Sequence, residues 1–390
     1  MLDPDFDVVV VGGGLVGLSL ACALRNSGLR IALVDRAPPP PPCSAAAVDW
    51  DVRVYAVSPG SEAFLLGCGA WPKSARKAPV FSMEVFGDAA GSRLAFDAHQ
   101  ARVVHLAQVV ENRLLLDALW QRVHDSGVRI FAPARCTAAT FEDDAAQLSL
   151  AGQEPLRARL LVAADGAQSW LRAQAGIEAQ VTRYRHTAVV ANFACERAHR
   201  GIALQWFRPD GVLALLPLPG NRCSMVWSAE EGLAGDLMTA GGEALAQHVA
   251  EASGHRLGRL EQITAPAAFP LQLVRVRQMV RPRLALVGDA AHNLHPLAGQ
   301  GVNLGFQDAR ELARVLLQRG ACRDAGEYRL LRRYERARRE DILAMTWVTH
   351  GLQRLFDDPS PPLSWIRNRG LSLMDRAGPL KQLLVRRALG

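Results

Sequence analysis

A glycine-rich turn near the N-terminus constrains the fold of this chain more than any other feature. Gly12, Gly14 and Gly17 follow the apolar, β-branched run Asp7–Val11 and precede the helix-forming residues Leu15–Ser27. In such a strand, turn and helix unit the first glycine allows a tight turn, and the second lets a ligand approach the backbone. The third lets the helix pack closely on the strand. The pattern predicts a Rossmann-like unit.

The end of the next strand carries an acidic residue at the position that this unit requires. The apolar run 30–34 ends at Asp35. A carboxylate there accepts hydrogen bonds from the ribose of a dinucleotide whose pyrophosphate lies at the helix N-terminus. A glycine turn that serves packing alone is the alternative. The sequence therefore predicts a dinucleotide site, and the glycine spacing alone leaves NAD and FAD both open.

Composition and targeting signals exclude several classes of protein. With 49% hydrophobic and 21% charged residues in 390, the chain is neither disordered nor fibrous. The uncharged stretch Val8–Leu24 contains four glycines, is shorter than the about 20 residues of a membrane span, and follows acidic rather than basic residues. Seven widely spaced cysteines without a Cys-x-x-Cys pair indicate reduced side chains. We therefore expect a cytoplasmic protein.

Two further strand-ending motifs favour FAD over NAD. Residues 160–166 form an apolar run that ends in Asp165-Gly166, and residues 284–292 form another that ends in Gly288-Asp289. A carboxylate in the second motif can accept hydrogen bonds from the ribityl hydroxyls of a flavin. Each motif alone is also typical of an ordinary turn. Their order behind the N-terminal glycine turn favours a flavoprotein.

The segment after Asp289 is predicted to be a loop that leads into a helix. His292 and His295 lie three residues apart there, but no third ligand stands at metalloenzyme spacing, so we predict no metal site. The helix N-terminus that follows would stabilise negative charge on a reduced flavin ring. His295 is a weak candidate for the catalytic residue, and a structural role for one of the histidines stays open.

The rest of the chain predicts a second sheet and C-terminal helices. Short strand-like runs at 188–194, 202–207, 212–218 and 222–228 indicate an antiparallel sheet, and 80–87 with 93–97 indicate a hairpin. Residues 106–123, 305–317 and 328–344 have helical patterns. We predict an FAD-binding domain (1–180 and 275–345), with the 75–100 hairpin joining the sheet of a substrate domain (181–274), and a C-terminal helical segment (346–390).

Together these motifs resemble the group A flavoprotein monooxygenases, relatives of 4-hydroxybenzoate hydroxylase, and more closely the ring hydroxylases of ubiquinone biosynthesis. The resemblance covers nearly the whole chain, and its more specific segments are 51–59, 109–115, 165–166 and 295–305. It implies an α/β fold in which a Rossmann-like FAD-binding domain is interrupted by a mostly antiparallel substrate-domain sheet and followed by C-terminal helices.

The resemblance also implies the cofactor contacts. Arg53 and Gln108 would contact the FAD phosphates or ribityl chain, and Asp289 would hold the ribityl chain. Asp165 would lie in the turn associated with FAD and NAD(P)H. Arg113 or Asn112 would occupy one further aligned position. The expected cofactor-binding residues are Gly12, Gly14, Gly17, Asp35, Arg53, Gln108, Asp165, Gly166, Gly288, Asp289, Pro296, Gly299, Gly301, Val302 and Asn303, the last two through their backbone.

The implied activity is hydroxylation of the aromatic ring of a polyprenylated phenol in ubiquinone biosynthesis. It would use FAD, O2 and transient NADPH or NADH, by way of a flavin C4a-hydroperoxide. His295, His292 and Tyr184 are candidates for a general base by residue type alone. Two alternatives stay open: an FAD-binding oxidoreductase of the same fold that acts on another hydrophobic substrate, and a non-catalytic flavin-binding assembly protein.

The charge distribution bears on partners. The whole net charge of +7 lies from Asn303 onward, where 17 Lys and Arg stand against 10 Asp and Glu. Leu380, Leu383 and Leu384 share one helical face beside cations, which suits contact with the inner membrane or with a ubiquinone-biosynthesis complex. A solvated or docked terminal helix is the alternative. We expect no specific binding of nucleic acid.

Overall fold

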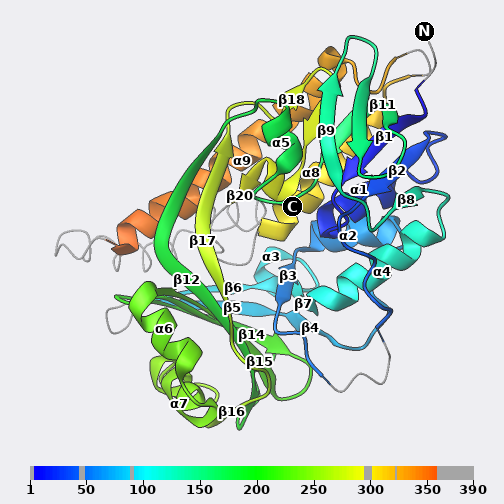
Figure 1. Cartoon of the computed structure of the whole chain (residues 1–390). Helices are drawn as coiled ribbons and strands as arrows, with labels where there is room; N and C mark the ends of the chain where they lie inside the picture. Colours follow the sequence, from blue (N-terminus) through cyan, green and yellow to red (C-terminus); the bar gives the residue numbers. More distant parts are fainter. Residues whose placement is uncertain (1–3, 44–48, 88–91, 294–300, 321–322, 358–390) are drawn as a thin grey trace.

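The computed structural model describes residues 4–43, 49–87, 92–293, 301–320 and 323–357, with side chains described through residue 344. Its described strands form sheets of eight, nine and three strands. The eight-stranded sheet and its helices lie at one end of the molecule, and the nine-stranded sheet lies at the other (Figure 1).

The eight-stranded sheet is the predicted Rossmann-like unit. Its parallel centre has the order β19-β11-β1-β2-β8, and the flanking strands β18, β10 and β9 are antiparallel to their neighbours. The central strands are apolar along their length because helices cover the sheet. The strands are β1 (Phe6–Val11), β2 (Ile31–Val34), β8 (Arg129–Phe131), β9 (Cys136–Phe141), β10 (Ala146–Leu150), β11 (Leu156–Ala163), β18 (Val280–Arg281) and β19 (Leu284–Leu286).

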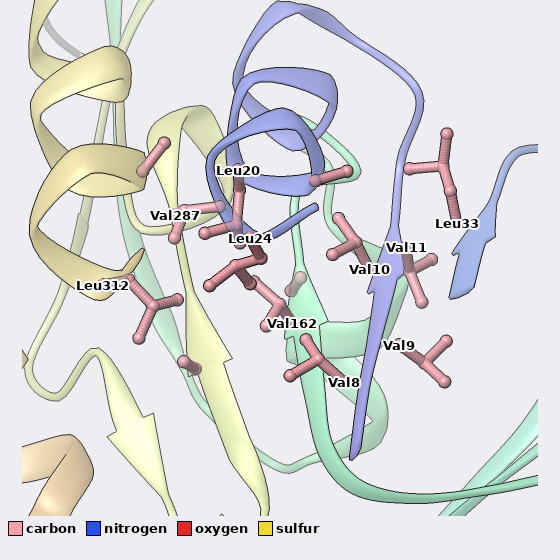
Figure 2. Packing of buried hydrophobic residues seen from close by; sticks show 14 of the residues in the cluster. Val8, Val9, Val10, Val11, Leu20, Leu24, Leu33, Val162, Val287 and Leu312 are labelled. Atoms are coloured by element: carbon pink, nitrogen blue, oxygen red, sulfur yellow. The ribbon is translucent and has the colours of Figure 1, made fainter. Parts of the chain in front are cut away.

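The core of this unit lies between the sheet and the helices α1 (Leu15–Leu24) and α8 (Gly301–Leu317). Figure 2 shows Leu20 and Leu24 of α1 close to Val162 of β11 and to Leu312 of α8. All four side chains are fully buried. Helix α1 is thus held between the sheet and α8, which fixes the position of its N-terminus.

The nine-stranded sheet is mostly antiparallel, as the sequence predicts; the pair β13 and β5 is parallel. The long strands β12 and β17 run from the first unit into this sheet, and the helices α6 and α7 cover its outer face (Figure 1). The elements are β5 (Ser82–Phe86), β6 (Arg93–Asp97), β12 (Ala179–Cys195), β13 (Ile202–Arg208), β14 (Gly211–Leu218), β15 (Arg222–Glu230), α6 (Glu231–Thr239), α7 (Gly242–Ala252), β16 (Leu260–Gln262), β17 (Ala267–Val276) and β20 (His292–Asn293).

A three-stranded sheet corrects one sequence-based expectation. The run 106–123 is not all helix, because its first part is strand β7 (Ala107–Glu111), and helix α4 (Asn112–His124) begins only afterwards. Strand β7 pairs with β3 (Val54–Val57) on one side and with β4 (Lys77–Val80) on the other. Hydrogen bonds to distant strands here override the helical pattern of the sequence. The short helices α2 (Pro59–Gly67), α3 (Ala98–Ala101) and α5 (Trp170–Gln174) complete this part.

Helices follow the last strand. After α8, helix α9 (Tyr328–Asp357) packs against α8 and β18. The α/β fold class, with a parallel sheet, a mostly antiparallel second sheet and C-terminal helices, is confirmed. The exact domain boundaries stay a prediction, and residues 358–390, with the predicted basic amphipathic segment, lie outside the described residues. Within the described part, none of the helices combines the length and apolar character needed to span a membrane.

Candidate functional site

The three glycines of the turn have two different roles: two are packed tightly against backbone, and one leaves open space. A Cβ atom on Gly12, where φ is +117°, would lie 2.2 Å from the carbonyl oxygen of Ala164, and one on Gly17 would lie 2.0 Å from the carbonyl oxygen of Gly12. A Cβ atom on the exposed Gly14 would meet no described atom within 4 Å. Gly12 and Gly17 therefore serve packing, and Gly14 leaves the N-terminus of α1 open. This is the space that a pyrophosphate requires.

Asp35 holds the glycine turn as well as facing the expected ribose. Its Oδ2 accepts a hydrogen bond from the backbone N–H of Gly13 at 2.5 Å, and its Oδ1 accepts one from Ala37 at 2.7 Å. Each carboxylate oxygen can accept a further hydrogen bond. Asp35 thus ties the end of β2 to the turn before α1 and keeps acceptor capacity for a ligand hydroxyl.

Asp165 lies in a second turn, at the end of β11. Its Oδ2 accepts a hydrogen bond from the N–H of Leu171 at 3.0 Å, and its Oδ1 accepts one from the hydroxyl of Ser169 at 2.5 Å. The buried Arg172 donates to the carbonyl oxygen of Ala290 at 2.8 Å. The Asp165-Gly166 turn is therefore fastened to the Gly288–Ala290 turn.

Asp289 presents an open carboxylate beside the α1 N-terminus. Its side chain is exposed to solvent, yet surrounding protein raises its pKa by desolvation, while the charges of His292 and Arg53 act in the opposite direction. The neighbouring Gly288 has φ +58°, and a Cβ atom there would lie 3.1 Å from Val16 of α1. Glycine therefore allows this turn to approach α1, and the Asp289 carboxylate fits the role of an acceptor for ribityl hydroxyls.

Arg53 and Tyr55 lie near Asp289. Arg53 donates to the Tyr55 hydroxyl at 2.8 Å, and its guanidinium lies 5.0 Å from the ring centroid of Phe269 on β17. Burial raises the pKa of Tyr55, and the charge of Asp289 adds to this effect while that of Arg53 opposes it. Sequence reasoning missed Tyr55; its signal is the two-residue spacing that places it on the same strand face as Arg53.

Gln108 on β7 has an unsatisfied acceptor. Its Oε1 is buried without a hydrogen-bond partner among the described residues. Such orphaned acceptors are rare in folded proteins and are typical of positions that bind a ligand or water. The observation fits the expected contact with FAD.

Glu111 at the end of β7 organises the chain around Arg53. The buried carboxylate of Glu111 accepts a hydrogen bond from the N–H of Asp51 at 2.7 Å and forms ion pairs with Arg76 at 2.8 Å and Arg113 at 3.2 Å. Asp51 in turn accepts from the N–H of Arg53 at 3.0 Å. Arg113 thus takes part in fixing this segment, and Glu111 is a positioning residue that the sequence analysis missed.

Asn303 fastens the first turn of α8 to the segment between β3 and α2. Its buried side chain accepts from the N–H of Ser58 and donates to the carbonyl oxygen of Ala56, both at 2.9 Å. Val302 is half-buried beside it, and Gly301 begins the helix. The side chain of Asn303 is engaged in structure, so a flavin contact there stays a prediction for the backbone. Pro296, Gly299 and the candidate His295 lie outside the described residues.

His292 is buried, and its Nε2 donates a short hydrogen bond, 2.6 Å, to the carboxylate of Asp308 on α8. This bond occupies the Nε2 atom, and the geometry corresponds to the structural role that the sequence left open. Across residues 4–43, 49–87, 92–293, 301–320 and 323–344, no three His, Cys, Asp or Glu side chains gather as metal ligands would.

An apolar cluster joins the second sheet to α8. Leu273 of β17 and Leu304 of α8 are buried against each other, and the half-buried Tyr184 of β12 packs on them. The half-buried Phe269 lies farther along β17, with Arg53 over its ring. Tyr184 and Phe269 are both half-buried, and an aromatic, hydrophobic molecule can pack against such rings.

Comparison with known proteins gives matches over the whole chain. Residues 5–347 match the family described as FAD binding domain. The chain is 37% identical to the ubiquinone hydroxylase UbiL of Rhodospirillum rubrum, over 100% of this chain and 90% of that protein. It is 36% identical to the 3-demethoxyubiquinol 3-hydroxylase of Escherichia coli, over 100% of both chains.

Solved structures share the fold at lower identity. The monooxygenase PqsL of Pseudomonas aeruginosa superimposes with a TM-score of 0.75 at 22% identity, over 94% of this chain and 99% of that one. HpxO of Klebsiella pneumoniae, in complex with FAD and uric acid, superimposes with a TM-score of 0.75 at 18% identity, over 97% and 96%.

Proposed function

The chain belongs to the FAD binding domain family, and from this premise we propose that it hydroxylates the ring of a polyprenylated phenol in ubiquinone biosynthesis. It is an FAD-dependent monooxygenase. The observation that carries the proposal is the 36% identity to a 3-demethoxyubiquinol 3-hydroxylase that extends over the full length of both proteins.

The described residues fit FAD. We propose that the open N-terminus of α1 at Gly14 takes the pyrophosphate, that Asp35 accepts from the ribose, and that Asp289 accepts from the ribityl hydroxyls. Arg53 and the orphaned Oε1 of Gln108 supply further polar contacts. When bound, FAD supplies the chemistry that the side chains lack: it accepts electrons from NADPH or NADH and activates O2 for transfer of one oxygen atom to the ring.

The protein's own contribution is to orient the aromatic ring and to exclude water. We propose that the phenol lies against the half-buried rings of Phe269 and Tyr184, near the first turn of α8. The N-terminal end of that helix stabilises negative charge nearby. An apolar environment excludes water, so that the activated oxygen is not lost before it is transferred to the ring.

The proposed substrate also favours a particular localisation of the protein. A polyprenylated phenol resides in or near a membrane, so we propose that the chain is cytoplasmic and contacts the inner membrane peripherally. The net positive charge from Asn303 onward is the supporting observation, since anionic lipid headgroups attract Lys and Arg. Contact with other proteins of the pathway through the same C-terminal part is the alternative.

Anaerobic reduction tests the function. The purified holoprotein is mixed with NADPH or NADH, with and without a prenylated phenol, and flavin absorbance is followed before oxygen is admitted. We expect the phenol to accelerate reduction and to yield a hydroxylated product. Reduction that yields only hydrogen peroxide with every phenol would favour another substrate, and a protein that takes up no FAD would contradict the assignment.

A matched pair of variants sharpens this test. Asp289→Asn removes the charge of the proposed ribityl ligand, and Asp236→Asn removes a charge from the exposed surface of α6. We expect only Asp289→Asn to lose FAD on gel filtration. Equal retention of FAD by both variants would contradict the role of Asp289.

A further inference from the structure

A fully buried carboxylate lies behind the turn that carries Asp289. The Oδ2 atom of Asp308 accepts a hydrogen bond from the N–H of Gly288 at 2.9 Å and contacts Nε2 of His292 at 2.6 Å. Its Oδ1 accepts from Nε of Arg338, on α9, at 2.7 Å. The carboxylate of Asp308 on α8 therefore connects both ends of the 288–292 segment to helix α9.

Asp308 and Arg338 form a buried ion pair. Asp308 is completely buried and Arg338 is 3% exposed. Burial opposes ionisation of Asp308, but the charges and hydrogen bonds of His292 and Arg338 outweigh it and hold its pKa below the usual value. Arg338 also pairs with Asp341 at 2.8 Å. Asp308 is thus an anion at neutral pH, and a charged acceptor forms stronger hydrogen bonds than a neutral one.

Asp289 lies within a segment whose neighbouring residues are held by hydrogen bonds, and its own side chain is exposed to solvent. Gly288 and His292, which flank it, are both bound to the same oxygen of Asp308. Between them, the carbonyl oxygen of Ala290 accepts from the buried Arg172 at 2.8 Å. The backbone is thus held at Gly288 and Ala290 and the side chain of His292 is held as well, which fixes the backbone position from which the Asp289 side chain extends. A ligand then binds without first having to order the turn.

We propose that Asp308 is a positioning residue for the cofactor, and that the bridge from Arg338 through Asp308 to Gly288 and His292 presets Asp289 for the ribityl chain of FAD. This inference rests on the proposed function. It makes flavin affinity depend on helix α9, whose residue Arg338 is paired with Asp308.

The test measures FAD affinity and stability separately on the apoprotein. His292→Leu removes one arm of the bridge, and His292→Gln keeps a donor at about the reach of Nε2. Asp308→Asn combined with Arg338→Met removes the charged pair, and with it the arm of the bridge to α9, without leaving an unpaired buried charge. Tyr334→Phe is the matched control, because it deletes a buried hydrogen bond of α9, to the carbonyl oxygen of Leu286 at 2.8 Å, outside the turn.

We expect the dissociation constant of FAD, measured by quenching of flavin fluorescence, to rise about tenfold or more in His292→Leu and in the double variant, since hydrogen bonds to charged groups have this strength. His292→Gln should restore most of the affinity. Tyr334→Phe should lower the melting temperature of the apoprotein and leave FAD affinity within about twofold of the parent.

The outcomes are distinguishable. If His292→Leu and the double variant bind FAD as tightly as the parent while their melting temperatures fall, the bridge is only structural and the inference is wrong. If His292→Gln binds as weakly as His292→Leu, the donor to Asp308 is not the cause. A parent apoprotein that binds no FAD would contradict the proposed function itself.

Discussion

We propose that two turns contact FAD, and different forces shape them. The turn at Gly12–Gly17 is shaped by backbone packing, since added Cβ atoms would lie 2.0 to 2.2 Å from carbonyl oxygens. The turn at Gly288–Asp289 is shaped by buried charges, since Asp308 and Arg338 hold it from two helices. The first turn therefore depends chiefly on the absence of side chains at its glycines, and the second depends chiefly on buried charged residues from α8 and α9.

The difference determines how each turn fails. The first turn is damaged by a methyl group added at Gly12 or Gly17. The second turn is strongly destabilised when one partner of its buried ion pair is lost. The following predictions test this contrast.

The largest effect is expected for Asp308→Asn alone. It leaves the buried Arg338 without its main partner, which costs about 3–5 kcal/mol of the free energy of unfolding. Urea denaturation of the apoprotein measures the loss. Adding Arg338→Met should recover a large part of it, because the unpaired charge is removed; a double variant no more stable than the single one would contradict this electrostatic account.

Gly17→Ala should have the next largest effect. Its methyl group would lie 2.0 Å from the backbone oxygen of Gly12, and overpacking of this kind costs about 1–3 kcal/mol. Gly14→Ala is the control: its methyl group meets no described atom, so stability should change by less than about 0.5 kcal/mol while FAD affinity falls. Equal destabilisation of the two variants would show that packing does not distinguish these glycines.

Tyr334→Phe should cost about 1 kcal/mol, the usual contribution of one buried neutral hydrogen bond. The hydroxyl donates to Leu286 at 2.8 Å at the end of β19, before the charged turn begins. Thermal denaturation measures the change. A loss as large as that of Asp308→Asn would mean that α9 acts on the turn through packing rather than through charge.

The smallest effect concerns pH. The pKa of Asp308 is lowered in the folded protein from an ordinary value of 3.8, by His292 and Arg338 against the effect of burial. Its contribution to stability is therefore complete above about pH 4 and is lost as the pH falls through the lower, folded value. The stability difference between the parent and the Asp308→Asn, Arg338→Met variant should change with pH in that acidic range. The Gly17→Ala difference should not.

The sequence predicts the first of these two turns and not the buried charges that hold the second. The glycine pattern and Asp35 predict the first unit because they fall within one strand, turn, helix and strand stretch, from Phe6 to Asp35. Asp308 and Arg338 were missed because a helical pattern alone treats charges as solvated. A signal exists, since Asp308 lies four residues after Leu304 and four before Leu312, on the buried face of α8.

The predicted helix over 106–123 begins too early for a related reason. Residues 107–111 form β7 because β3 and β4 supply hydrogen bonds from residues 54–57 and 77–80, which no local pattern reports. Helix α4 begins where that pairing ends, at Asn112. The positions of Tyr55 and Glu111 in the site depend on this sheet, so they too lay beyond local patterns.

The pairing of β11 with β19 has a consequence for how the protein is made. These strands are neighbours in the parallel sheet, yet residues 164–283 lie between them, and most of the second sheet is built from those residues. During synthesis the first unit stays incomplete until this long insertion has left the ribosome, because residues 161–163 of β11 lack their partner strand β19. We expect nascent chains that end before residue 284 to be recognised by chaperones and to remain unable to retain flavin, so that cofactor capture is a late event in biogenesis.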